Sequence, residues 1–267
     1  MEYIDSHCHL DFEPLQPVEQ TITAARNAGV SEFIVPGVSP GEWSSLQSLS
    51  SEFDCIHCAF GVHPWWIKQC LLEKHSLSMV EKTLARLVTE PYCLAVGETG
   101  LDGKADTPMT EQLQWFEAHV RLACEAKKPL IIHAVNEHPR IQKVLKRYRP
   151  PCGGVIHGFS GSYELGASYW KMGFYLGVGG TITYPRANKT RNAVSRLPLE
   201  CLLLETDSPD MPLNGRQGET NYPQFLPLVA EELASLRGVA VEEVALQTSE
   251  NARCLFALPI REPVKEP

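Results

Sequence analysis

The chain has 267 residues, of which 43% are hydrophobic and 21% are charged, and its formal net charge is −8 at pH 7. This composition is ordinary for a soluble globular protein with a large core, and the length suits one large domain or two small ones. The acidic balance excludes a surface that attracts nucleic acid as a whole. A polyanionic substrate must therefore be held locally, by metal ions or by a few basic side chains.

The N-terminal residues show no secretion-signal pattern, and no run approaches the roughly 20 apolar residues of a membrane span. Nine cysteines, an odd number, lie partly within apolar runs, which indicates reduced and buried thiols in the cytoplasm. Cys55 and Cys58 have the spacing of a zinc or redox motif, but they lie in a predicted strand without a second pair, so we favour packing. We expect a cytoplasmic monomer without a stable protein partner and without membrane contact.

Apolar runs of strand length alternate with segments of helical periodicity along the chain. The pattern predicts strands at 3–6, 32–36, 55–60, 93–97, 129–133, 153–157, 173–178 and 200–205. It predicts helices at 17–28, 41–52, 78–89, 109–126, 137–147, 162–171, 188–196, 223–237 and 241–251.

Eight strands alternating with helices are typical of an α/β fold of the TIM type, the (β/α)8 barrel. An open, doubly wound sheet is the alternative, but it seldom has eight strands in a domain of this length, and no dinucleotide-binding motif is present. Residues 1–258 are therefore predicted to form a single barrel domain. Residues 259–267, rich in proline and charge, are predicted to be a short frayed tail.

Six side chains with metal-binding chemistry follow the predicted strands. They are His7, His9, Glu98, His133, His157 and Asp207. Because the active sites of such barrels lie at the carboxyl ends of the strands, we expect the six to meet at one rim. A single His-x-His motif arises often by chance, and a single carboxylate after a strand often caps a turn. The repetition of such residues, strand after strand, favours a metal site.

Four imidazoles and two carboxylates form a mixed nitrogen and oxygen site, which suits Zn²⁺, Mn²⁺, Co²⁺ or Fe²⁺ and accommodates Mg²⁺ less comfortably. Six ligands are too many for one tetrahedral ion, so we predict two divalent ions bridged by Glu98 and a hydroxide. Asp207 is expected to bind a metal and to take a proton from the bound water, which makes Glu98 and Asp207 the catalytic candidates. His119 shares a helical face with Trp115 and Leu122, so we expect it to pack there.

Five further motifs follow one another in order along the chain. They are Ile4–His9, Gly61–Pro64, Gly97–Asp102, His157–Ser162 and Leu203–Pro209. In these motifs the chain resembles the TatD family of metal-dependent hydrolases, the TatD-type deoxyribonucleases. The segments Gly179–Arg186 and Pro209–Gly215 resemble the YjjV-like subgroup in particular.

The resemblance implies a TIM-type barrel with a two-metal site. It implies that His7, His9 and Asp207 hold one ion, that His133 and His157 hold the other, and that Glu98 bridges them. It also implies hydrolysis of DNA, often from the 3′ end, and some relatives are linked to the deacylation of misacylated tRNA.

The substrate contacts differ from the family pattern at one place. Many relatives have Ser-Arg after the histidine of the fifth strand, whereas this chain has Ala134 and Val135. Basic residues in predicted rim loops are candidate replacements for that arginine, or are solvated surface. They are Arg186, Lys189, Arg191 and Arg216. His63 follows the third strand and is a candidate substrate contact. Trp65 and Trp66 beside it would stack a base or cover the end of the barrel.

The leading hypothesis is a phosphodiesterase, a 3′–5′ exonuclease that acts on DNA ends with a two-metal-activated water. The alternative is that the same metal site hydrolyses an ester or amide bond instead of a phosphodiester. The order of the ligands along the chain also resembles the wider amidohydrolase superfamily, which supports this alternative. An esterase or amidohydrolase, such as an aminoacyl-tRNA deacylase or a small-molecule hydrolase, would use the same ions. A metal-binding scaffold without activity is the third hypothesis, and the complete ligand set speaks against it.

Overall fold

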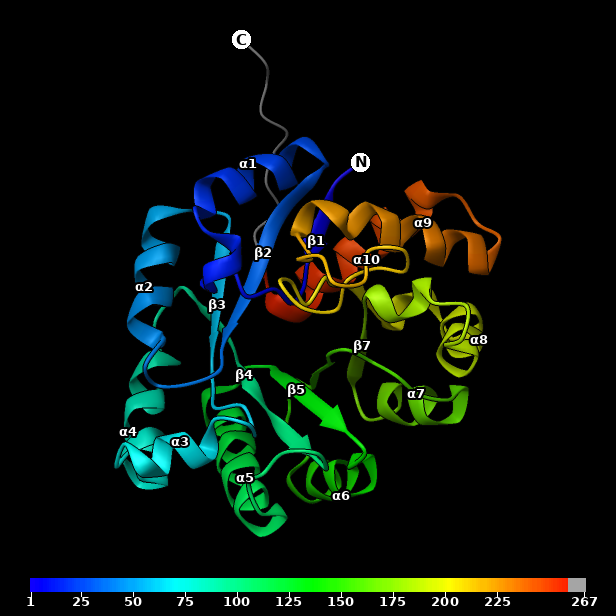
Figure 1. Cartoon of the computed structure of the whole chain (residues 1–267). Helices are drawn as coiled ribbons and strands as arrows, with labels where there is room; N and C mark the ends of the chain where they lie inside the picture. The colour runs from blue at the N-terminus through cyan, green and yellow to red at the C-terminus, as the bar shows by residue number, and fades with distance from the viewer. Residues whose placement is uncertain (259–267) are drawn as a thin grey trace.

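The structure, a computed structural model, describes residues 1–258, and the predicted tail at 259–267 lies outside the described residues. Eight parallel strands form one sheet in sequential order (Figure 1). Their bounds are β1 Tyr3–Asp5, β2 Val30–Gly37, β3 Ile56–Phe60, β4 Cys93–Asp102, β5 Leu130–Val135, β6 Gly154–Ile156, β7 Phe174–Val178 and β8 Leu202–Leu204. The amide of Ser6 donates a hydrogen bond of 3.0 Å to the carbonyl of Leu204, which brings β8 beside β1. The sheet is a nearly closed barrel, and the predicted TIM-type fold is confirmed.

The helices lie outside the strands and alternate with them (Figure 1). Their bounds are α1 Val18–Asn27, α2 Trp43–Glu52, α3 Ile67–Leu72, α4 Leu77–Leu87, α5 Met109–Ala126, α6 His138–Tyr148, α7 Tyr163–Trp170, α8 Asn188–Arg196, α9 Leu226–Arg237 and α10 Val241–Phe256. Every predicted helix is present. The short α3 was not predicted, because six residues are too few to show a helical period. Among residues 1–258 no helix is long and apolar enough to cross a membrane.

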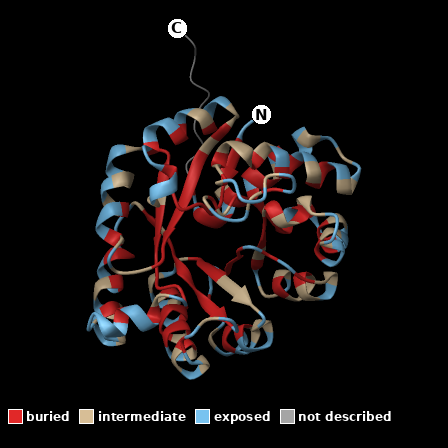
Figure 2. Cartoon of the chain, in the orientation of Figure 1, coloured by how far each residue is buried: buried red, intermediate tan, exposed pale blue. Residues whose placement is uncertain are grey.

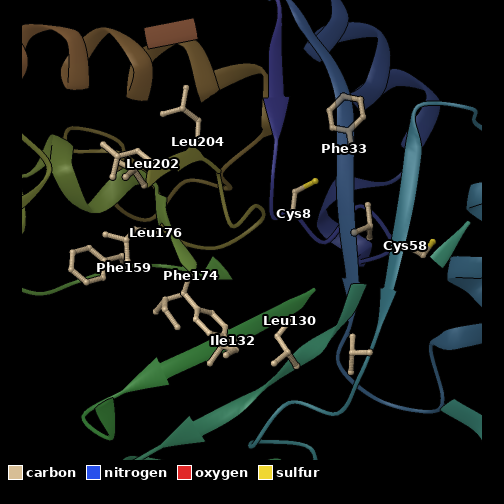
Figure 3. Packing of buried hydrophobic residues seen from close by; sticks show 14 of the residues in the cluster. Cys8, Phe33, Cys58, Leu130, Ile132, Phe159, Phe174, Leu176, Leu202 and Leu204 are labelled. Carbon is tan, nitrogen blue, oxygen red and sulfur yellow. The ribbon is translucent and has the colours of Figure 1, made fainter. Parts of the chain in front are cut away.

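The strands bury both of their faces, as parallel strands between a barrel interior and surrounding helices must. One set of side chains faces the helices, and Figure 3 shows part of this outer layer, including Phe33 on β2 and Leu204 on β8. Cys55 and Cys58 belong to this layer, and all nine cysteines are free thiols, so the packing interpretation of the Cys-x-x-Cys motif is confirmed.

The other face of each strand fills the barrel with small and branched apolar residues. They are Ile4, Ile34, Ala59, Ala95, Ile131, Val155 and Leu203, one from each of seven strands. Leu255 and Phe256 of α10 pack against this inner layer. The helix therefore covers the barrel interior, and Figure 2 shows the strands buried while the outer faces of the helices are exposed.

The inner layer forms the floor of the predicted site. Residues i and i+2 of a strand share a face, so Ile131 places His133 on the inner side of β5. In the same way Val155 precedes His157. The end of β5, from His133 onward, is only half-buried, which marks the place where the barrel opens to solvent (Figure 2). The candidate ligands therefore stand on a dry apolar layer.

Strand β4 breaks the alternation at Glu98. Val96 pairs with Leu130 and Thr99 pairs with Ile132, so three steps on β4 match two steps on β5. Ala95 faces the interior, and a regular strand would therefore turn Glu98 outward, toward the helices. The extra residue is a bulge that re-aims the side chain. Glu98 is 2% exposed and points into the barrel, and β4 continues to Asp102 instead of ending at residue 97.

Candidate metal centre

The six predicted ligands come from five different strand ends. His7 and His9 follow β1, Glu98 and His133 lie on β4 and β5, His157 follows β6, and Asp207 follows β8. Four of them follow the carboxyl ends of their strands, and Glu98 and His133 lie in the carboxyl-terminal halves of β4 and β5. The structure brings all six together at one rim. This is the rim at which TIM-type barrels place their active sites.

Glu98 lies at the centre of the group and faces a different pair of histidines with each carboxylate oxygen. Its Oε2 is 3.3 Å from His7 Nε2 and 3.7 Å from His9 Nε2. Its Oε1 is 2.9 Å from His157 Nε2 and 3.2 Å from His133 Nδ1. One carboxylate therefore joins two halves of the centre.

Asp207 belongs to the first half. Its Oδ1 lies 3.5 Å from His7 Nε2 and 3.7 Å from His9 Nε2. The backbone amide of Asp207 donates a hydrogen bond of 2.9 Å to the carbonyl of His7, which holds the residue at a φ of +57°. The geometry thus groups the side chains as the family resemblance implies, and their roles as ligands stay a prediction.

His63, a predicted substrate contact at the rim, lies directly beside Glu98. Its Nε2 is 3.4 Å from Glu98 Oε1, and its ring centroid is 4.2 Å from that of His133. Burial lowers the pKa of His63 to about 3, so its imidazole is neutral. His63 is therefore placed to act as a hydrogen-bonding or ligating group beside the second half.

The close approach of ring nitrogens tests whether a cation fits. His7 Nε2 and His9 Nε2 are 3.2 Å apart, and His133 Nδ1 and His157 Nε2 are 3.1 Å apart. Each pair of nitrogens faces one oxygen of Glu98, so each half directs three electron-rich atoms at one place. A proton can satisfy two such atoms at a time, whereas a divalent ion with mixed nitrogen and oxygen ligands satisfies all three. Both halves fit such an ion.

The electrostatics keep the central carboxylate ionised. Burial alone would raise the pKa of Glu98, but the surrounding histidines, His157 first, outweigh burial and hold this pKa well below its usual range. Burial would also lower the pKa of His157, but Glu98 outweighs it and raises that pKa to about 10. The centre is therefore arranged around one buried negative charge that attracts positive charge on both sides.

A second buried carboxylate lies beside His157. Glu205 is 1% exposed, accepts a short hydrogen bond from the amide of Gly158, and has its Oε1 3.9 Å from His157 Nδ1. Burial raises the pKa of Glu205 to about 8. A Cβ at Gly177 would lie 2.0 Å from Glu205 Oε2, so glycine is required on β7 for this side chain to fit.

A pocket of about 440 Å³ opens above the centre. Five of the candidate ligands line it, together with apolar and aromatic side chains. The apolar and aromatic side chains include Phe12, Trp65, Trp66 and Met211. Among the described residues that line the pocket, Lys104 is the only lysine or arginine. The pocket therefore offers stacking surface and little fixed positive charge.

The predicted arginine contacts lie outside this pocket. Arg186 lines an adjoining pocket of about 290 Å³ that shares Met211 with the first, and its guanidinium lies 4.8 Å from the ring centroid of Tyr184. Arg216 lies over the ring of Phe225 at 4.3 Å and is 3.3 Å from Glu219. Substrate binding by either arginine stays a prediction.

Two other buried polar residues, His119 and Asp102, lie outside the predicted ligand set. His119 accepts a hydrogen bond of 3.1 Å from the amide of Val62 and is 2.7 Å from the carbonyl of Trp115, so its predicted packing role is confirmed. Asp102 was not predicted, although its Oδ2 lies 3.0 Å from His133 Nε2. Its only sequence signal was its position at the end of the Gly97–Asp102 motif.

Comparison with known proteins identifies the family. The family model described as TatD related DNase matches residues 4–257. The chain belongs to the TatD family. Several of its members are named as metal-dependent hydrolases, and the present chain is one by its family membership.

Three relatives show how far the similarity extends. The chain is 40% identical over 260 residues to the uncharacterized metal-dependent hydrolase YjjV of Escherichia coli (strain K12), with 96% of this chain and 98% of that protein covered. The crystal structure of the YjjV protein superposes with a TM-score of 0.90 at 38% identity and the same coverage. The 3′–5′ ssDNA/RNA exonuclease TatD of Pantoea vagans is 32% identical, covering 90% of this chain and 93% of that protein. The predicted family and its YjjV-like subgroup are confirmed.

The position of Glu98 depends on a glycine at the end of β3. A Cβ at Gly61 would lie 2.5 Å from the carbonyl oxygen of Glu98 and 2.7 Å from the carbonyl carbon of Gly97. We expect Gly61→Ala to displace this part of β4, to lower the free energy of unfolding by about 1–3 kcal/mol, and to reduce the zinc retained after dialysis. Urea unfolding and metal analysis measure the two effects.

Gly41→Ala is the matched control, because its only neighbour within 4 Å would be Ser39 Oγ at 3.8 Å. The control should change the unfolding free energy by no more than about 0.5 kcal/mol. A Gly61→Ala protein with the stability and zinc content of the unaltered protein would contradict this account of how Glu98 is held.

Proposed function

We propose that the protein is a two-metal phosphodiesterase that removes nucleotides from the 3′ ends of DNA. The proposal depends on one observation: the two carboxylate oxygens of Glu98 face two separate sets of histidines. Two divalent ions, Zn²⁺, Mn²⁺ or Mg²⁺, are the proposed cofactors, with His7, His9 and Asp207 holding one and His133 and His157 holding the other. The name of the Pantoea relative, a 3′–5′ exonuclease of single-stranded DNA and RNA, supports the choice of substrate.

The proposed mechanism gives each side chain one task. When bound, the ions would supply Lewis-acid activation of a water molecule and would neutralise charge on the phosphate oxygens. Glu98 would hold the two halves at a fixed separation. Asp207, at the open side of the first half, would orient the attacking water and accept its proton. His63 would contact the phosphate from the second half.

The surroundings of the centre fit a terminal nucleotide. The aromatic wall formed by Trp65 and Trp66 offers a stacking surface for a base. We also propose that residues 1–258 act as one domain and as a monomer, with a DNA end as the binding partner. The nine free thiols support a cytoplasmic location.

The proposal predicts a metal-dependent 3′–5′ exonuclease activity. The purified protein should shorten a single-stranded oligonucleotide, labelled at its 5′ end, stepwise from the 3′ end in the presence of Zn²⁺, Mn²⁺ or Mg²⁺. Asp207→Asn should lower the rate by about 10²–10⁴-fold, because it removes the proton acceptor. An oligonucleotide that stays intact with every metal, although the protein is folded and contains metal, would rule out the nuclease.

A second candidate function, the hydrolysis of esters or amides, has one observation in its favour. Lys104 is the only lysine or arginine among the described residues that line the pocket, so the pocket is poorly equipped to attract a polyanion. An aminoacyl ester and a phosphodiester chromogen, compared with the same metal, separate the two functions. Faster turnover of the aminoacyl ester would favour the deacylase.

The adjoining pocket predicts a role for Arg186 in holding the strand that leads to the cleaved bond. Arg186→Gln should raise the KM for oligonucleotides about tenfold, the equivalent of ~1.4 kcal/mol, and should leave the KM for a phosphodiester chromogen unchanged. Arg196→Gln is the matched control, since Arg196 also lies over a tyrosine ring, that of Tyr163 at 4.6 Å, but belongs to neither pocket. Equal KM values for both variants would remove Arg186 from the substrate site.

A further inference from the structure

Asp102 is a buried carboxylate next to the metal centre that has no place in the ligand set. It is 1% exposed and lies at the end of β4, four residues after Glu98. A buried carboxylate is stable only when hydrogen bonds or opposite charges compensate for the lost hydration. The hydrogen-bond partners of Asp102 therefore show which groups stabilise its charge and which side chains it positions.

One oxygen of Asp102 accepts from two different side chains. Its Oδ2 is 3.0 Å from His133 Nε2 and 2.7 Å from the indole Nε1 of Trp65. His133 belongs to the second half of the metal centre, and Trp65 belongs to the apolar wall of the pocket. Asp102 Oδ2 thus connects a candidate metal ligand, His133, with a side chain of the pocket wall, Trp65.

The carboxylate is held rigidly from its other side. Its Oδ1 accepts a hydrogen bond of 2.7 Å from the amide of Lys104. The amide of Asp102 donates to Gln112 Oε1 at 2.8 Å, and Gln112 Nε2 donates to the carbonyl of Asp102 at 3.0 Å. Gln112 belongs to the long helix α5, so Asp102 is fixed to the scaffold and cannot turn to follow its partners.

The consequence for His133 is a fixed tautomer. Both ring nitrogens of His133 face a carboxylate oxygen, and a carboxylate oxygen can only accept. When a cation lies between Nδ1 and Glu98, the single proton of the neutral ring must lie on Nε2, facing Asp102. The lone pair is then on Nδ1, which faces Glu98 Oε1 at 3.2 Å. Nδ1 is therefore presented to the second half of the centre as a ligand atom, in the arrangement that carboxylates impose on metal-binding histidines.

The consequence for Trp65 is a fixed side chain at an exposed position. Trp65 is 63% exposed, and packing alone would leave such a ring free to change rotamer. The bond to Asp102 holds the indole edge, and the ring lies nearly perpendicular to that of His63, at 88°. The face of the ring is thereby kept in the wall of the pocket.

We propose that Asp102 is a positioning residue that sets the proton of His133 and the orientation of Trp65 together, and that Trp65 is a substrate-contacting residue. The part that concerns the substrate rests on the proposed function, whereas the part that concerns the metal does not. The two parts are therefore tested by different measurements.

The first experiment uses the unaltered protein loaded with Zn²⁺. Two-bond proton–nitrogen correlation spectra of the histidine rings report the tautomer, and the loss of one set of signals in His133→Gln assigns His133. The expected result is a proton on Nε2 and the metal on Nδ1. A proton on Nδ1 would overturn the proposal, and this result does not depend on whether any variant of Asp102 folds.

The second experiment compares Asp102→Asn with Glu32→Gln in zinc competition against a chromophoric chelator. The asparagine would still accept from the amide of Lys104 but would turn donors toward His133 and Trp65, so the affinity of the zinc site beside His133 should fall about 10- to 100-fold. Glu32 is the matched control, because it makes an equivalent bond of 2.8 Å to His57 near the opposite end of the strands. Zinc affinities of Asp102→Asn within twofold of the control would overturn the role assigned to Asp102.

The third experiment separates Trp65 from the metal. Trp65→Phe keeps an aromatic ring but cannot donate to Asp102. Its zinc affinity should stay within about threefold of that of the unaltered protein, because His133 keeps its partner. The KM for oligonucleotides should rise with kcat unchanged. An unchanged KM would remove Trp65 from the substrate site and leave the role of Asp102 toward His133 intact.

Discussion

The site depends on the burial of one carboxylate, Glu98, between two sets of imidazoles. Removing such a charge from water costs several kcal/mol unless partners compensate for it. Five histidines, His63 among them, lie within 3.7 Å of its oxygens and make the ionised form the stable one. The same histidines would be poorly satisfied among themselves, with ring nitrogens only 3.1 and 3.2 Å apart. Carboxylate and imidazoles thus form an arrangement that two cations complete.

The backbone makes this burial possible. Ile131 and Val155 belong to an apolar layer that fills the barrel directly beneath His133 and His157, so water reaches the centre only from the open rim. The bulge in β4 turns Glu98 inward where a regular strand would have turned it outward. Gly61 leaves room for the displaced backbone. This irregularity in the strand therefore determines the position of the central carboxylate.

The sequence predicted the eight strands, nine of the ten helices within residues 1–258, and the convergence of the six candidate ligands. These features follow from local periodicity and from the rule that strand ends meet at one rim. The bulge at Glu98 could not be predicted, because a one-residue change of register depends on the neighbouring strand and leaves no period in the sequence.

The surroundings of the ligands were less accessible to sequence reasoning than the ligands themselves. Asp102 was missed because β4 is longer than its apolar run, and its partner Trp65 is remote in sequence. Arg186 and Arg216 were predicted at the rim from their loops alone, and the structure places both outside the main pocket, since each guanidinium lies over a nearby aromatic ring. The contacts of a long side chain depend on tertiary packing, so they could not be predicted from the sequence.

The central claim is that Glu98 joins two metal sites, and anomalous diffraction from crystals grown with Zn²⁺ tests it most directly. The account predicts two peaks about 3.5–4 Å apart, one beside His7, His9 and Asp207 and the other beside His133 and His157. One oxygen of Glu98 should bind each ion. A single peak, or two peaks on the same side of Glu98, would contradict the account.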